Sequence, residues 1–183
     1  MAQRALLLKI GWLPRQCGSA KVPRVRAILV TATLLFLAAP TSAAQILFAG
    51  GSWAAIDFGA RCEARSKALW AKAGTKPFAG FAFDRTGSRL GQFYVRLARP
   101  ARSGATVIAT IGREPFLLVG RGEWAWSRGP EQQRAMIAAA RYQGGMRIDA
   151  RDVRGARIVD RYDLSGAATA IDAAAAACAG KSG

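Results

Sequence analysis

The sequence predicts a mainly β protein: a small antiparallel β-sandwich-like domain with one internal helix and a C-terminal alanine-rich helix. From residue 45 onward, short apolar runs are separated by glycine and polar turns, without a repeat or a long linker. Such spacing is typical of antiparallel sheets. Two later stretches instead carry the end signals of helices. The length of 183 residues suits one domain with a core and is too short for two ordinary domains once a leader is removed.

The N-terminal segment has the composition of an export signal. Residues 27–39, AILVTATLLFLAA, follow the basic stretch KVPRVR and precede the small residues of PTSAA. Because this order is typical of a secretory signal peptide, we expect a leader over residues 1–44 and a single periplasmic or secreted domain over residues 45–183. Cleavage is expected after Ala44, with cleavage after Ala43 as the alternative. A membrane anchor is the competing interpretation, but 13 apolar residues span only about 20 Å of a hydrocarbon core about 30 Å thick.

The first part of the expected domain contains one strand and one segment without a clear period. QILFAGGSWAAIDFG predicts a strand interrupted at Gly50 and Gly51, where we expect a bulge or a bend. RCEARSKALWAKAG predicts irregular or briefly helical structure.

Two hairpins are predicted next. FAGFAFDR and GQFYVRLAR flank the turn-rich TGSRL, and in the second arm Phe93, Val95 and Leu97 alternate with polar neighbours. ATVIATI and PFLLVG flank GRE, and EWAWS continues the meander with Trp124 and Trp126 on one side.

A third hairpin is predicted in GMRIDARDVRGARIVDRYDL, with DVRG as its turn. In the first arm Met146, Ile148 and Ala150 face inward. The outward positions of that arm are Arg147, Asp149 and Arg151.

Helix signals occur on both sides of this hairpin. In GPEQQRAMIAAARYQGG, Pro130 suits the first helical position, Glu131 complements the helix dipole and Gly144 suits the C-terminal cap. The apolar stripe of this helix consists of Met136, Ile137 and Ala140. Ser165 is expected to cap the N-terminus of the last helix, GAATAIDAAAAAC.

The cysteines predict a disulfide between Cys62 and Cys178. Cys17 would be removed with the leader, and the absence of a cysteine next to the expected cut argues against a lipid-anchored protein. Cys178 shares one face of the last helix with Ile171, so it points toward the core, and two cysteines in an exported domain form one obvious pair. The alternatives are two buried free thiols, or a nucleophilic Cys62 activated by neighbouring arginines.

The stretch RAMIAAARYQGGMRIDARDVRGARIVDRYDLSGAATAIDAA resembles the C-terminal half of the invasion-associated locus B family of exported alphaproteobacterial proteins. The resemblance covers roughly residues 105–178 and rests on an amphipathic helix, a strand, a short turn, a second strand and an alanine-rich helix. The family's usual internal cysteine pair has no counterpart in FLLVGRGEWAWSRGP. The resemblance implies a β-sandwich-like periplasmic or surface protein without enzymatic activity.

The sequence offers little material for catalysis. It contains no histidine, which excludes a Ser-His-Asp hydrolase and removes the commonest metal ligand. The carboxylate pairs Asp149 with Asp152, or Asp160 with Asp163, are the remaining option for acid–base chemistry in a periplasmic enzyme. Both pairs lie among arginines, so cross-strand ion pairing explains them without chemistry. We expect no cofactor and no metal site, because Ca²⁺-loop and phosphate-loop spacings are absent.

The charge balance predicts an anionic partner. The net charge is +16, and the six basic residues in the leader, with no acid, leave +10 for the mature domain. Export argues against nucleic acid as the partner, so the candidates are an anionic envelope glycolipid, phospholipid headgroups reached by peripheral contact, or an acidic protein. One set of candidate contact residues is the outward arginines of the third hairpin: Arg147, Arg151, Arg157 and Arg161. A separate candidate is the pair Trp124 and Trp126, flanked by arginines on its own strand, with the alternative that these tryptophans are core and rim residues. The competing interpretation of the arginines is that they only reflect base composition and solubility.

Overall fold

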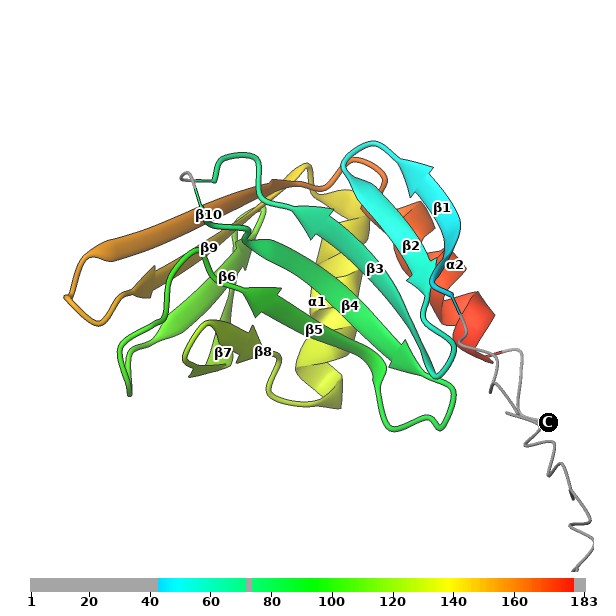
Figure 1. The fold of residues 1–183 in the computed structure, drawn as a ribbon, viewed down its shortest axis with the longest axis horizontal. Helices are drawn as coiled ribbons and strands as arrows, with labels where there is room; N and C mark the ends of the chain where they lie inside the picture. Colours follow the sequence, from blue (N-terminus) through cyan, green and yellow to red (C-terminus); the bar gives the residue numbers. More distant parts are fainter. Residues whose placement is uncertain (1–42, 72–73, 180–183) are drawn as a thin grey trace, which may run out of the picture. The chain divides into compact units, whose positions relative to one another are not determined.

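A computed structural model describes residues 43–71 and 74–179, which form ten strands and two helices (Figure 1). The predicted signal segment up to residue 42 and Cys17 lie outside the described residues. In chain order the elements are β1 (Gln45–Gly50), β2 (Trp53–Asp57), β3 (Arg61–Lys67), β4 (Phe78–Asp84), β5 (Leu90–Arg96), β6 (Val107–Ile111), β7 (Glu114–Arg121), β8 (Trp124–Trp126), α1 (Pro130–Tyr142), β9 (Gly145–Arg151), β10 (Arg157–Asp163) and α2 (Ala167–Ala179).

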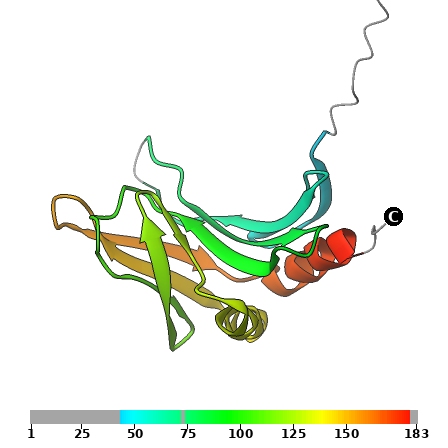
Figure 2. The same ribbon diagram turned by 90° about the horizontal axis from the view of Figure 1, so that it is seen from below.

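All ten strands pair antiparallel in one open sheet with the order β1-β2-β3-β4-β5-β8-β7-β6-β9-β10. The sheet bends sharply, so that β9 and β10 pass beneath the first strands (Figure 2). Hydrogen bonds join the first strands to the β9–β10 hairpin: the indole nitrogen of Trp53 donates to the carbonyl of Asp163 at 2.9 Å, and the backbone nitrogen of Leu69 donates to the carbonyl of Arg161 at 2.8 Å. The buried apolar side chains of both groups of strands belong to one hydrophobic core. The predicted fold class, mainly β with an internal and a C-terminal helix, is confirmed.

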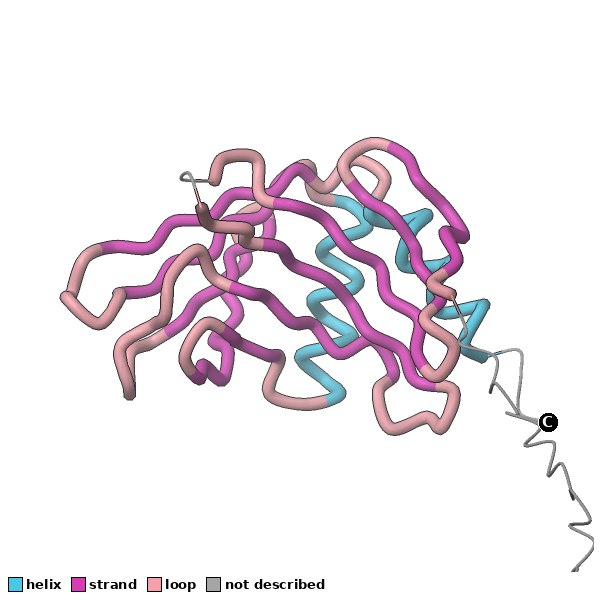
Figure 3. Tube along the Cα trace, in the orientation of Figure 1, coloured by secondary structure: helices cyan, strands magenta, loops and turns pink. Residues whose placement is uncertain are grey.

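Both helices cover the same face of the sheet, as the tube in Figure 3 also shows. Helix α2 packs on β1 to β4, and α1 packs on β5, β6 and β7. The buried face of the sheet carries large apolar side chains, among them Phe81 on β4, Phe93 on β5 and Ile148 on β9, each fully buried. Alanines on α2 let its backbone approach the sheet closely, because a methyl group is the only side-chain volume between them.

The predicted alternation in the third hairpin is confirmed. Met146, Ile148 and Ala150 of β9 are buried. On β10, Ile158, Asp160 and Tyr162 are buried. The hairpin around residues 84–90 and the meander of β6, β7 and β8 also form as predicted.

Two predictions for the first part of the domain are wrong. Residues 61–67 form strand β3, where irregular or helical structure was expected. Their inward side chains, Cys62, Ala64 and Ser66, are small, so the alternation has no strong apolar signal. A turn at Gly51 and Ser52 separates two strands, and Gly50 ends the first of them opposite Trp53, where a bulge or bend within one strand was expected. Gly51 has a φ of 58°, which glycine adopts without strain.

The helix ends differ from prediction on the C-terminal side of α1 and the N-terminal side of α2. Pro130 begins α1 as predicted, but the cap residue is Gln143 in an extended conformation, so Gly144 is not the cap. Met136 and Ala140 are buried. Ser165 does not cap α2, because its hydroxyl donates to the carboxylate of Asp163.

The predicted disulfide is present in the structure. Cys62 on β3 is bonded to Cys178 in the last turn of α2, and their Cα atoms lie 5.8 Å apart. Both residues are buried, as is Ile171 on the same helix face. The bond therefore fixes the end of α2 to the middle of the sheet. Because the sulfur of Cys62 is already bonded and the residue is 0% exposed, it offers no thiolate in this state.

Candidate binding surfaces

The β9–β10 hairpin reaches away from the rest of the domain. Its turn end is the part most distant from α2 in both Figure 1 and Figure 2. The two strands pair over their whole length, from Gly145 opposite Asp163 to Arg151 opposite Arg157. This uninterrupted register fixes which outward side chain of β9 lies opposite which outward side chain of β10.

The register places the four predicted arginines on one face of the hairpin. Arg151 lies directly opposite Arg157, and Arg147 lies directly opposite Arg161. All four are exposed. We call these residues the arginine strip: Arg147, Arg151, Arg157 and Arg161. The antiparallel pairing thus brings the two predicted sets together, while their role in binding stays a prediction.

One acid lies within the arginine strip. Asp149, opposite Val159, accepts from Nε of Arg147 at 2.6 Å and from Nη2 of Arg157 at 3.3 Å. Arg151 donates to the carbonyl of Gly155 in its own turn at 2.9 Å. Four arginines against one aspartate leave three positive charges in excess, and the side chains of Arg147 and Arg157 remain 49% and 69% exposed.

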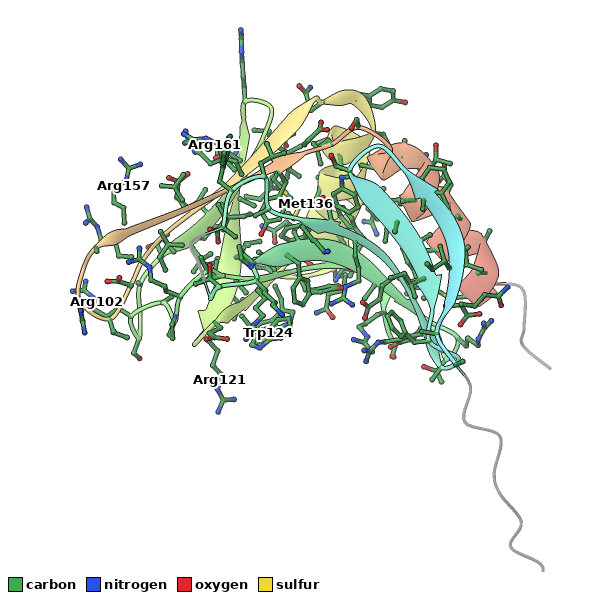
Figure 4. The ribbon with its side chains drawn as sticks, turned by 45° about the horizontal axis from the view of Figure 1, so that its top comes forward. Arg102, Arg121, Trp124, Met136, Arg157 and Arg161 are labelled. Atoms are coloured by element: carbon green, nitrogen blue, oxygen red, sulfur yellow. A yellow bond between two sulfur atoms is a disulfide. The ribbon has the colours of Figure 1, made fainter. Side chains whose placement is uncertain are left out.

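Three further arginines, which the sequence did not single out, extend this basic surface around the hairpin turn. Arg154 is exposed in the turn itself, and Arg102, from the segment between β5 and β6, donates its backbone N–H to the carbonyl of Arg151 at 2.9 Å. Arg99 donates to the carbonyl of Arg157 at 2.7 Å. Figure 4 shows Arg102 and Arg157 pointing outward near the hairpin turn, and Arg161 further along β10. The only signal for the upstream pair was the density of arginine in ARPARSG.

The predicted tryptophans lie on a different surface. Trp124 and Trp126 are on β8, opposite Arg96 and Tyr94 of β5. Trp124 is 37% exposed and packs edge-on against Phe78, with ring centroids 5.6 Å apart. In Figure 4 it lies well away from Arg157 and Arg161. The structure therefore does not combine the tryptophans and the arginine strip into one site.

Charges near these aromatic rings are paired internally. The carboxylate of Glu63, 5% exposed, accepts from the phenol of Tyr94 at 2.6 Å and contacts Arg61 at 2.8 Å and Arg65 at 3.3 Å. Burial, reinforced by the negative charge of Glu63, raises the pKa of Tyr94 far above its ordinary value. The phenol of Tyr94 therefore stays protonated and donates a hydrogen bond to the carboxylate of Glu63. The guanidinium of Arg65 also lies over the ring of Phe78, 4.3 Å from its centroid.

The first of the candidate carboxylate pairs serves local structure. Asp152 accepts from the backbone N–H groups of Arg154 and Ala156 and pairs with Arg99 at 2.9 Å, whereas Asp149 lies on the outward face. Two depressions of the described surface, one lined by Arg96 and Glu123 and the other by Phe58 and Arg61, do not include Asp149 or Asp152.

The second pair is divided between the two faces of β10. Asp160 is buried and accepts from the backbone nitrogen of Ala98 at 3.0 Å; burial raises its pKa. Asp163 accepts from the hydroxyls of Ser165 and Ser52, and these hydrogen bonds lower its pKa. Neither residue lines the two depressions.

Comparison with known proteins found no match among protein-family models, curated proteins or solved structures. Within residues 43–71 and 74–179, no three His, Cys, Asp or Glu side chains gather closely enough to hold a metal ion.

Proposed function

We propose that this protein is an exported, non-enzymatic envelope protein of the invasion-associated locus B type that acts by binding an anionic envelope component through the arginine strip. One observation carries the proposal. The β9–β10 register aligns two cross-strand pairs of exposed arginines on a projecting hairpin, with a single acid between them. Like charges placed directly opposite each other destabilise a sheet, so this arrangement costs stability and gains a surface complementary to negative charge.

Two features support export: the leader with its expected cut, and the disulfide. The leader has the order of a secretory signal peptide, and strand β1 begins at Gln45, directly after the expected cut at Ala44. Cleavage there leaves every described strand intact. The Cys62–Cys178 disulfide is of the kind that persists in oxidising compartments. Among the described helices, neither is long and apolar enough to span a bilayer.

The chemistry of the strip favours phosphate or carboxylate groups as ligands. A guanidinium presents a planar fork of N–H donors that pairs two oxygens of one anion. Lipid headgroups and envelope glycolipids display such anions at high density, and each basic residue near an anionic membrane contributes about 1 kcal/mol of attraction. Nucleic acid carries the same phosphates, but an exported protein does not normally meet it.

The non-enzymatic part of the proposal rests on how the candidate catalytic groups are used. Cys62 is held in a buried disulfide. The four candidate aspartates each accept hydrogen bonds from neighbouring backbone or side-chain groups.

Vesicle binding tests this function. The exported, processed protein is mixed with vesicles containing anionic phospholipid, and separately with vesicles of neutral phospholipid, at low and at moderate salt. We expect binding to the anionic vesicles that weakens as salt rises, because exposed charges are screened over about 8 Å at physiological ionic strength. Equal binding to both vesicle types, or no binding to the anionic ones, contradicts the proposal.

Export is tested separately by intact-mass analysis of the protein from its native host. The expected mass corresponds to a chain beginning at Gln45, with Ala44 as the alternative first residue. Recovery of the uncleaved chain from the membrane fraction would instead identify an anchored protein.

A further inference from the structure

The turn of the β9–β10 hairpin holds an apolar side chain out in solvent. Val153 is 64% exposed, although valine is usually buried. Its position is fixed by Asp152, whose Oδ1 accepts from the backbone N–H groups of Arg154 at 3.0 Å and Ala156 at 2.9 Å. Gly155, with a φ of 82°, completes the turn. The turn is therefore built so that Val153 stands at its tip.

Four arginines lie in this turn or next to it, and we call them the basic ring: Arg102, Arg151, Arg154 and Arg157. Arg154 is the direct neighbour of Val153, and Arg151 and Arg157 form the cross-strand pair that closes the turn. Arg102 is attached to the same end through the hydrogen bond from its backbone to Arg151. All four are exposed.

The acid in the turn does not cancel this charge at the surface. The side chain of Asp152 is only 7% exposed and forms an ion pair with Arg99 at 2.9 Å. Its remaining acceptor capacity is used by the turn's own backbone. The surface presented to a partner is consequently one apolar side chain beside four exposed arginines, of which Arg157 also pairs with Asp149 at 3.3 Å.

An exposed valine beside the basic ring matches one kind of partner better than the others. A soluble anion or an acidic protein surface would bind the guanidinium groups but would gain little from an exposed valine. At an anionic bilayer, the phosphates lie above the acyl chains. The arginines can therefore contact the phosphates while Val153 contacts the apolar region beneath them. The long arginine side chains can keep their charges at the phosphates while the tip lies deeper.

We propose that the turn of the β9–β10 hairpin docks end-on into the interfacial region of an anionic phospholipid bilayer. Val153 lies below the phosphate level, and the basic ring contacts the phosphates: Arg102, Arg151, Arg154 and Arg157. This inference rests on the proposed function and specifies its partner and its orientation. Because one valine buries a small area, the docking is reversible and peripheral.

A fluorescent probe at the tip tests the orientation. Val153→Cys is labelled, without reductant, with a dye that shifts to the blue in apolar surroundings. The matched control is Leu90→Cys, since Leu90 is 71% exposed and begins β5, which does not pair with β9 or β10. With anionic phospholipid vesicles we expect a blue shift and quenching by acyl-chain quenchers for the label at residue 153, and neither for the label at residue 90.

An unlabelled variant gives the second readout. Val153→Ser should bind anionic vesicles about three- to tenfold more weakly than the wild type, because the apolar contact is lost while every arginine stays. Leu90→Ser should bind like the wild type. Urea unfolding of each variant verifies that the domain is folded, which an exposed turn position permits.

The outcomes separate the two proposals. If the wild type ignores anionic vesicles, the proposed function fails. If the wild type binds them but the label at residue 153 reports water and Val153→Ser binds unchanged, the flat arginine strip makes the contact and the end-on docking is overturned. A soluble polyanion provides one more comparison. If the wild type binds the polyanion as tightly as it binds the bilayer, and Val153→Ser does the same, the protein recognises negative charge alone. That result also overturns the end-on docking.

Discussion

The arginines of the first five strands and those of the β9–β10 hairpin are used in opposite ways. In the first group Arg85 pairs with Asp57 at 2.6 Å, and Arg89 pairs with Asp84 at 2.8 Å, with the acids mostly buried. In the hairpin, the one aspartate within the arginine strip, Asp149, pairs with only two of its four arginines, Arg147 and Arg157. Charge in the first group therefore holds loops and strands together, whereas charge in the hairpin remains available to a partner.

The same two regions differ in how tightly they are closed. The disulfide ties α2 to β3, and the β1–β2 turn lies against the connection between β10 and α2, with the N–H of Ser52 donating to the carbonyl of Ser165 at 2.9 Å. At the hairpin turn, a methyl group added at Gly155 would meet no atom within 4 Å, so this position is open to solvent. The comparison predicts that stability depends mainly on the first region and binding on the second.

Removing the disulfide should have the largest effect on stability. The bond closes a loop with a sequence separation of 116, so Cys62→Ala with Cys178→Ala should lower the free energy of unfolding by about 4 to 5 kcal/mol from loop-closure entropy. Urea unfolding of the oxidised wild type and the double variant measures this. A loss below about 1 kcal/mol would show that the covalent bond is not what holds α2 in place.

Two glycine substitutions compare the closed and the open region directly. Gly166→Ala would place a Cβ 2.1 Å from the carbonyl oxygen of Gly50 at a φ of 85°, so we expect a loss of about 3 kcal/mol or more. Gly155→Ala meets open space at a similar φ of 82° and should cost only about 1 kcal/mol of backbone strain. Equal losses in thermal or urea unfolding would mean that the β1–β2 turn is not tightly packed.

Neutralising Asp149, the acid within the arginine strip, should strengthen binding to anionic vesicles. Asp149→Asn removes the negative charge that pairs with Arg147 and Arg157, and we expect affinity for anionic vesicles to rise about fivefold, since each charge near the surface is worth about 1 kcal/mol. The control is Asp172→Asn, which makes the same change of charge at an exposed pair with Arg141 on the helices. An equal gain in both variants would indicate that only net charge matters.

Buried Asp160 predicts a pH dependence where the hairpin meets the first strands. Burial raises its pKa above the ordinary value of 3.8, so the folded protein binds this proton more tightly than the unfolded chain. The resulting stability is fully present below pH 3.8 and is lost as pH rises through the folded-state pKa. Asp160→Asn cannot lose a proton, so its stability relative to the wild type should increase on going from acidic to neutral pH. Urea unfolding at several pH values measures the free energy of unfolding of both proteins. If the difference between Asp160→Asn and the wild type is the same at every pH, the prediction is contradicted.

The hairpin could be predicted from the sequence because its alternation is strict and its turn is short. Met146, Ile148 and Ala150 mark one face, and the arginines mark the other, so the register followed from the position of DVRG. The Cys62–Cys178 bond was predictable for a similar reason, since two cysteines leave one pairing.

Strand β3 and the wider basic surface could not be predicted in this way. The inward residues of β3 are Cys62, Ala64 and Ser66, which carry too little apolar area to define a period. Arg102 reaches the hairpin from about fifty residues upstream, and no local pattern reports such a contact. The sharp bend of the sheet (Figure 2) likewise has no local pattern in the sequence.

The central claim, that the hairpin arginines are the binding surface, is tested by two variants of equal charge. One changes the arginine strip to glutamine. The other changes four exposed arginines outside the hairpin to glutamine: Arg113, Arg121, Arg128 and Arg134. Their binding to anionic vesicles at low salt is compared by cosedimentation. We expect the strip variant to lose binding, by a factor of at least about 100 at about 1 kcal/mol per arginine, and the other variant to lose much less. Equal losses in the two variants, or unchanged binding of the strip variant, would contradict the account.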